Sequence, residues 1–202
     1  MKLSKTSKLG TKSWSLQALE TCPGSVGDNG ELVPACSGCY ATINCYTFPV
    51  VKQVRADNKV EWQGESFVGD FIQALAKQSH FRWFDSGDMY SLELAEKMFK
   101  IMANTPNTKH WLPTREYNII KQYTRIYGDF PDNLYIRLSA MYPDKPVKIP
   151  ASLAGVKNVT FSNVHTKGAK IFGARCIAPD NGGSCGSCRQ CWTNEGGSYE
   201  LH

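Results

Sequence analysis

The eight cysteines of this 202-residue chain lie near its two ends and leave residues 46–175 without any. Four lie in the first quarter of the chain and four in the last. The two groups are Cys22, Cys36, Cys39 and Cys45, and then Cys176, Cys185, Cys188 and Cys191. Any fold must therefore build its core from the cysteine-free middle and give the thiols at both ends a chemical role.

The surroundings of the cysteines favour metal binding over disulfides. The basic first ten residues precede no apolar stretch, so we expect no signal peptide and no membrane span. The expected compartment is the cytoplasm, where structural disulfides are rare and closely spaced cysteines more often bind metal.

Composition predicts one globular domain over residues 1–202. The chain is 42% hydrophobic and 20% charged, as folded domains usually are. The net charge of +5 comes without a dense Lys or Arg run, so nucleic acid is not the expected partner. We divide the domain into an N-terminal cysteine segment, a βα core and a C-terminal cysteine segment, over residues 1–50, 51–170 and 171–202.

The cysteine-free middle alternates between helix and strand patterns. Phe67, Phe71 and Leu75 recur at helical spacing, and Ser91 suits a helix N-cap. Leu134, Ile136 and Leu138 alternate as in a strand. Helices are expected over 66–78, 91–104 and 119–127, strands over 81–84, 110–114, 134–138, 158–164 and 170–178, and a loop over 142–150.

This alternation predicts an α/β fold with mostly parallel strands, because helices between strands allow parallel pairing. A complete eight-fold barrel needs about 250 residues, so we expect a partial or open (β/α)6-type barrel. Sites in such folds form at the carboxyl ends of strands. We therefore expect both groups of cysteine-rich loops, and the turn at residues 85–88, at one rim.

The C-terminal cysteines have the spacing of an iron–sulfur loop. Cys185, Cys188 and Cys191 follow one another at three-residue intervals, and Cys176 is the natural fourth ligand. Such a run wraps a 4Fe-4S cubane because successive thiolates reach different corners. The glycines between residues 182 and 186 allow backbone amides to approach the sulfides, and Arg189 adds a cation.

Zinc is the alternative interpretation. Four thiolates in two Cys-x2-Cys pairs form a common structural zinc site. Cys36 with Cys39 and Cys185 with Cys188 are such pairs, and one zinc ion held by both would join the two ends of the chain.

The N-terminal cysteines predict a second or shared cluster. Cys22, Cys36 and Cys39 together would hold three irons of a cubane and leave the fourth iron open to a substrate. Cys45 is either a further ligand or a small buried residue.

Several motifs in order resemble a family of phage and plasmid proteins known mostly as numbered gene products. The resemblance covers nearly the whole chain. The motifs are KTSKLGTKSW at 5–14, Cys22-Pro-Gly, Ala35-Cys-Ser-Gly-Cys-Tyr-Ala41, Ser86-Gly-Asp88, Thr114-Arg115 and Cys185-Gly-Ser-Cys-Arg-Gln-Cys-Trp192.

That family is in turn similar to the radical S-adenosylmethionine (SAM) superfamily. The resemblance implies a partial barrel with a cysteine loop holding a 4Fe-4S cluster after the first strand. It also implies that Ser86, Gly87 and Asp88 contact the amino group of SAM. The superfamily's usual loop is C-x3-C-x2-C, but Leu32 stands where its first cysteine would be. Ligation by both Cys22 and Cys45 would close the cluster to SAM.

Three functional interpretations follow. The first is a phage-type 4Fe-4S protein, with one or two clusters, a redox or structural role and an electron-transfer partner. The second is an enzyme that reductively cleaves SAM. The third is a zinc-stapled nucleic-acid-binding module. From the residues alone, Asp85 and Asp88 are expected to serve as turn and cap residues, and Arg115 as an anion clamp or salt-bridge partner.

Overall fold

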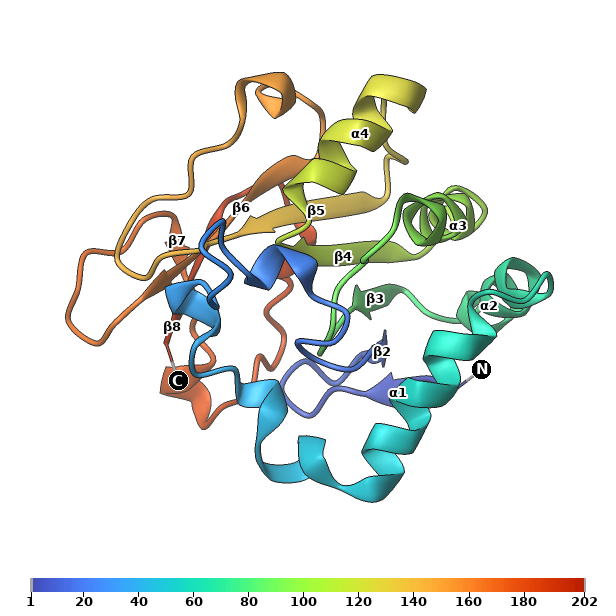
Figure 1. Ribbon diagram of the computed structural model, residues 1–202, viewed down its shortest axis with the longest axis horizontal. Coiled ribbons are helices and arrows are strands. Elements are labelled where there is room, and N and C mark those ends of the chain that lie inside the picture. The colour runs from blue at the N-terminus through green and yellow to red at the C-terminus, as the bar shows by residue number, and fades with distance from the viewer. Residues whose placement is uncertain (1, 202) are drawn as a thin grey trace.

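A computed structural model describes residues 2–201, which build one open sheet of eight strands in the order β1-β2-β3-β4-β5-β6-β8-β7 (Figure 1). Only the pair β1 and β2 is antiparallel, and all other neighbours are parallel. The strands are β1 (Ser4–Lys5), β2 (Lys12–Trp14), β3 (His80–Trp83), β4 (Lys109–Thr114), β5 (Leu134–Ser139), β6 (Val159–His165), β7 (Ala174–Arg175) and β8 (Gly197–Glu200).

Three of the four helices cover one face of the sheet (Figure 1). These are α2 (Phe67–Leu75), α3 (Leu92–Ala103) and α4 (Tyr117–Tyr127). The remaining helix, α1 (Pro49–Glu61), lies beside β2, where the Asn58 side-chain amide donates to the Ser15 carbonyl at 3.0 Å. We call the opposite, helix-free face of the sheet the inner face.

The main core lies between the sheet and these three helices. Side chains alternate along β3, so Phe81 and Trp83 point to the helices while Arg82 points to the inner face. The Trp83 ring stacks on Phe71 of α2, with centroids 4.8 Å apart. Full burial of each such side chain contributes about 1.5–3 kcal/mol to stability, so this layer fixes the sheet that carries the cysteine loops.

The structure confirms the three expected helices and four of the five expected strands, within a few residues at their ends. The Ser91 hydroxyl accepts a hydrogen bond from the Leu94 amide at 3.2 Å, as an N-cap does. Gly128, with φ +80°, ends α4. Residues 142–150 contain no helix or strand.

The expected strand over 170–178 is wrong except at Ala174–Arg175. Gly173 interrupts it with φ +91°, and a Cβ there would lie 2.7 Å from the Gly196 carbonyl oxygen. Strands β1, β2 and β8 were not expected, because they are short and lack a clear apolar alternation.

The fold is thus a mixed α/β architecture with a mostly parallel, open sheet, as expected at the level of fold class. Between residues 2 and 201, none of the helices has both the length and the apolar character needed to cross a bilayer.

Gly87 lets the loop after β3 approach the loop after β2. Its φ is +74°, and a Cβ there would lie 2.7 Å from both the Leu16 Cβ and the Thr21 hydroxyl. Such close approach in a left-handed conformation is a role that glycine fills best.

We predict that Gly87→Ala destabilises the protein much more than Gly155→Ala. Gly155 has φ +80° but open space around it, so alanine there costs only the left-handed strain of about 1–2 kcal/mol. At Gly87 steric overlap adds about 1–3 kcal/mol. Urea unfolding of both variants measures the difference, and equal losses would contradict the close approach.

Candidate metal centres

The loop after β2 carries the N-terminal thiol group, defined as Cys22, Cys36 and Cys39. Loops that follow three other strands hold it in place. Asp88 donates its amide to the Thr21 carbonyl at 3.0 Å, and Ala35 donates to the Met141 carbonyl at 3.0 Å. The Gly24 amide donates to Glu116 Oε1 at 2.7 Å. This group therefore lies at the carboxyl ends of β3, β4 and β5, as expected for a site in this fold.

The thiols of the N-terminal group lie close enough to influence one another. Burial raises the pKa of Cys22 to about 12, and the charges of Asp88, Cys36 and Cys39 add to the shift. Burial also raises the pKa of Cys36, and the positive charge of Arg115 opposes that shift. The structure thus brings these three cysteines together beside one arginine.

Cys45 is exposed, in a short 3-10 turn, Asn44–Thr47, that precedes α1. It lies near the buried Arg55 of α1. Its role as a further ligand stays a prediction.

Ser86, Gly87 and Asp88 connect neighbouring loops. The Ser86 hydroxyl donates to the Leu16 carbonyl at 2.7 Å. The Asp88 carboxylate accepts from the Thr114 hydroxyl and the Arg115 amide, each at 2.8 Å. Burial raises the pKa of Asp88 to about 6, against the effect of these hydrogen bonds. In this structure the motif joins the ends of β2, β3 and β4.

Asp85 and Arg115 also make structural contacts. Asp85 pairs with Arg82 at 2.8 Å and accepts from the Tyr46 hydroxyl at 2.7 Å. The Arg115 Nε donates to the Ala140 carbonyl at 3.0 Å. The structure therefore places Arg115 between the Cys36 thiol and the loop after β5.

Glu116 is a further residue of this site that no sequence pattern indicated, although it directly follows the Thr114-Arg115 motif at the end of β4. The residue is 6% exposed. Burial and the neighbouring Asp88 raise the pKa of its carboxyl to about 7. The N-terminal group thus has two buried carboxyl groups beside it.

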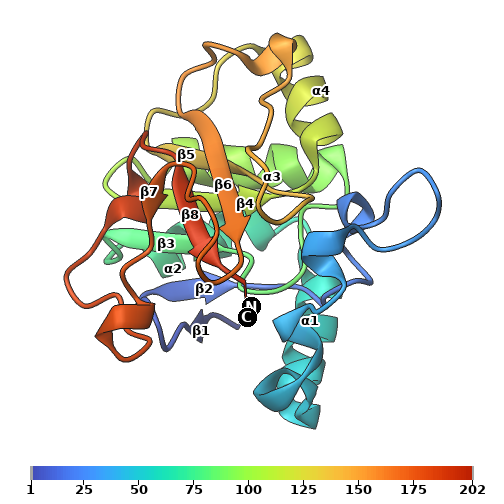
Figure 2. The same ribbon diagram turned by 90° about the vertical axis from the view of Figure 1, so that its left-hand side faces the viewer.

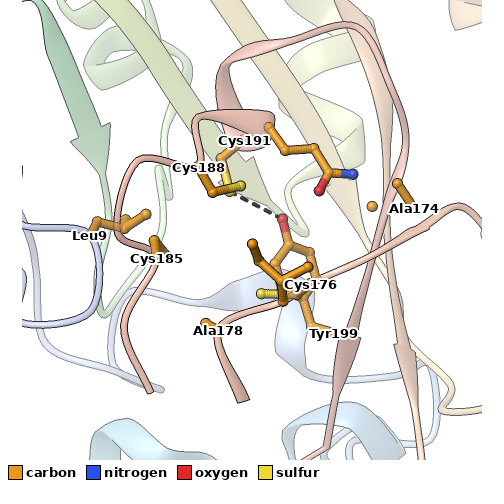
Figure 3. A pocket seen from close by; sticks show the side chains of 11 residues that line it. Leu9, Ala174, Cys176, Ala178, Cys185, Cys188, Cys191 and Tyr199 are labelled. Atoms are coloured by element: carbon orange, nitrogen blue, oxygen red, sulfur yellow. Dashed lines mark hydrogen bonds between the residues drawn. The ribbon is translucent and has the colours of Figure 1, made fainter. Parts of the chain in front are cut away.

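The C-terminal thiol group, defined as Cys176, Cys185, Cys188 and Cys191, surrounds a single cavity (Figure 3). Apolar side chains complete much of its wall. The other lining residues are Leu9, Ala174, Ile177, Ala178, Gln190, Gly197 and Tyr199.

Glycines shape the loop that carries these cysteines. Gly182, Gly183 and Gly186 all have positive φ, at +58°, +80° and +51°. The tight turn that contains Gly186 closes with a 2.9 Å hydrogen bond from the Cys188 amide to the Cys185 carbonyl. Such left-handed positions suit glycine and let the chain fold back on itself.

The C-terminal thiols also influence one another. Burial raises the pKa of Cys185 to about 11, and the other three cysteines of the group add to the shift. Burial raises the pKa of Cys191 as well, while the Tyr199 hydroxyl, 3.5 Å from its Sγ, and the charge of Arg137 lower it.

The two thiol groups lie at different places, so the expected single rim is wrong. The Cys185 amide donates to the Lys8 carbonyl at 2.9 Å, in the turn that precedes β2. Trp192 packs on His80, the first residue of β3. The C-terminal group therefore lies on the inner face toward the amino ends of β2 and β3. In Figure 2 the red C-terminal loops lie on the left, and the blue loop that follows β2 extends to the right.

Within each group the thiols act on one another. The thiols that act on Cys185 are the other three of its own group, and those that act on Cys22 are Cys36 and Cys39. The Cys36–Cys39 and Cys185–Cys188 pairs thus belong to different thiol groups, and the metal that each group binds stays a prediction.

Among residues 2–201, no three His, Cys, Asp or Glu side chains are close enough together to hold a single metal ion. In a mononuclear zinc site each sulfur lies about 2.3 Å from the same ion. A 4Fe-4S cubane binds its thiolates at four separate irons and so holds them farther apart.

The chain belongs to the Gene product 88 family, whose model matches residues 1–194. This match spans both thiol groups. Searches of curated proteins and of solved structures each found no match.

The buried carboxyl of Glu116 predicts a pH-dependent stability. Its pKa of about 7 in the folded state exceeds the ordinary value of 4.5, so the folded protein holds this proton more tightly. The contribution of Glu116 to stability therefore falls as pH rises between these values. Glu116→Gln keeps the acceptor for Gly24 and removes the ionisation.

We expect metal-free Glu116→Gln to gain stability relative to wild type between about pH 5 and about pH 8. Urea midpoints at both pH values measure this gain, with the exposed Glu65→Gln as control. A stability difference independent of pH would contradict the buried, proton-holding carboxyl.

Proposed function

We propose that this protein binds a 4Fe-4S cluster through Cys176, Cys185, Cys188 and Cys191. The observation that carries the proposal is that these four thiols line a single cavity. Four thiolates are the complete ligand set of such a cluster. When bound, the cluster would supply one-electron redox chemistry or hold the loop in place.

The residues around the cavity support this ligand set. Thiols must lose their protons to bind metal, and the Tyr199 hydroxyl and the charge of Arg137 lower the pKa of Cys191 against the effect of its burial. The Tyr199 hydroxyl can donate to the Cys191 sulfur, and hydrogen bonds of this kind tune cluster potentials.

We further propose a second cluster at the N-terminal thiol group. Three thiolates there would leave one iron without a cysteine, and Cys45 is exposed and lies by Arg55 instead. Two clusters in one chain favour a redox role with an external one-electron partner, and the C-terminal cluster alone would favour a structural role.

A radical SAM-type enzyme is the second candidate function. It is favoured by the three-thiol group at the carboxyl ends of parallel strands, beside Ser86, Gly87 and Asp88. The strands β2 to β6 lie in sequential order with helices on one face, as in a partial (β/α) barrel. The Ser86 hydroxyl and the Asp88 carboxylate are already engaged, so SAM contacts would fall to the backbone.

Cysteine substitutions test the cluster proposal through iron and sulfide content after anaerobic purification. Wild type is expected to be brown with about eight irons per chain, four for each cluster. Cys188→Ser is expected to lose about four irons from the C-terminal site. Cys36→Ser is expected to lose a similar number from the N-terminal site, and the exposed Cys45→Ser serves as control.

Zinc-loaded, colourless wild type would contradict the proposal. Full iron content in Cys188→Ser would also contradict it, because the C-terminal thiol group would then not be the ligand set.

SAM addition separates the two candidate functions. For a redox or structural protein, we expect the electron paramagnetic resonance spectrum of the dithionite-reduced protein to stay unchanged with SAM, and no deoxyadenosine to form. A changed spectrum with deoxyadenosine, both lost in Cys36→Ser, would establish the enzyme instead.

A further inference from the structure

Arg137 is a charged residue in the middle of a buried strand. On β5 it alternates with Ile136 and Leu138, which point into the main core, so its side chain lies on the inner face. Its exposed fraction is 0%. Arginine is almost never fully buried unless its charge is paired.

The hydrogen bonds of Arg137 leave its charge uncompensated. Its Nη2 donates to the Gln190 carbonyl at 2.8 Å and to the Thr193 carbonyl at 3.4 Å, and Nη1 to the Phe161 carbonyl at 3.4 Å. Its Nε is buried without a hydrogen-bond partner. These acceptors are neutral carbonyl oxygens, which satisfy N–H groups but supply no counter-charge.

Arg82, on the same face of the sheet in β3, shows the contrast. It forms an ion pair with Asp85 at 2.8 Å. For Arg137, by comparison, no carboxylate of residues 2–201 lies within ion-pair distance. A buried, unpaired ion is costly, so an anion absent from the protein chain itself is expected nearby.

Arg137 lies directly behind the cavity of the C-terminal thiol group. A Cβ on the lining residue Gly197 would be 2.8 Å from Arg137 Nη1, so the glycine leaves room for the guanidinium. Its charge reaches both Cys191 and Tyr199. Gln190 also lines the cavity, and its Nε2 is a second buried donor without a partner.

We propose that Arg137 is the buried counter-ion of an anionic iron–sulfur cluster held by the C-terminal thiol group, with the Gln190 amide as a further donor to it. The inference rests on the proposed cluster at that site. Four thiolates give a cubane a net negative charge, and one-electron reduction makes it more negative without forming or breaking a bond. A fixed cation behind the cavity therefore favours the reduced form.

Redox titration of the C-terminal cluster tests this positioning role. The Cys36→Ser background isolates that cluster, and dithionite supplies the electron. Arg137→Met keeps the length of the side chain but removes its charge. We expect it to lower the midpoint potential of the cluster by about 59 mV, which for one electron is a tenfold change in the ratio of oxidised to reduced cluster. Arg137→Lys keeps the charge and is expected to stay closer to wild type.

A matched control and a metal-free readout complete the test. Arg125→Met, at an exposed position of α4, is expected to leave the potential unchanged. Without metal, Arg137 lacks its counter-ion, so metal-free Arg137→Met is expected to be at least as resistant to urea as the metal-free parent.

Two results would overturn the inference while leaving the proposed cluster intact. One is an iron-loaded Arg137→Met with the potential of its parent. The other is loss of iron from Arg137→Met and Arg137→Lys alike, because shape and not charge would then matter. Loss of iron from Arg137→Met alone would support the charge requirement. Iron-free wild type would instead overturn the proposed function itself.

Discussion

The packing of Trp192 on the inner face of the sheet is the interaction on which the C-terminal thiol group depends. The indole is 2% exposed and donates to the Phe81 carbonyl at 3.0 Å. It also meets His80 and Trp111 edge-to-face, with ring centroids 5.0 Å and 5.9 Å away. Because Trp192 directly follows Cys191, this anchor places the last cysteine of the loop against the sheet. The helix-free face is thereby covered by a cysteine loop instead of a second helical layer.

At the N-terminal thiol group, two buried carboxyl groups hold the loops in place by hydrogen bonds. Asp88 ties the end of β4 to the turn after β3, and Glu116 holds the loop that follows Cys22 through the Gly24 amide. The charge of Asp88 also raises the pKa values of Cys22, of Cys36 and of the Glu116 carboxyl. One end of the chain is therefore held by two buried carboxyl groups and the other by aromatic packing beside the cation Arg137. These different electrostatic settings would give two bound clusters different properties.

Much of the fold could be predicted from the sequence because the middle of the chain is strongly periodic. Phe67, Phe71 and Leu75 indicated α2, and the Leu134–Leu138 alternation indicated β5. The spacing also grouped Cys176, Cys185, Cys188 and Cys191, which line one cavity in the structure. The single rim failed because the loop after β7 folds back toward the amino end of β2, where the Cys185 amide donates to the Lys8 carbonyl.

Single residues without a repeated pattern were the hardest to foresee. Glu116 gained its role from a contact with Gly24, 92 positions away in sequence. Arg137 carried a usable signal, since a charge between Ile136 and Leu138 in a buried strand calls for a partner. Only the structure places that charge behind the cavity of the C-terminal thiol group.

We propose that the four cysteines of the C-terminal thiol group bind an iron–sulfur cluster on the inner face of the sheet. X-ray diffraction from crystals of anaerobically purified protein, with data on both sides of the iron absorption edge, tests this proposal. We expect an iron-specific anomalous peak enclosed by Cys176, Cys185, Cys188 and Cys191, beside the Arg137 guanidinium. A zinc-specific peak there, or disulfides between these cysteines, would contradict it.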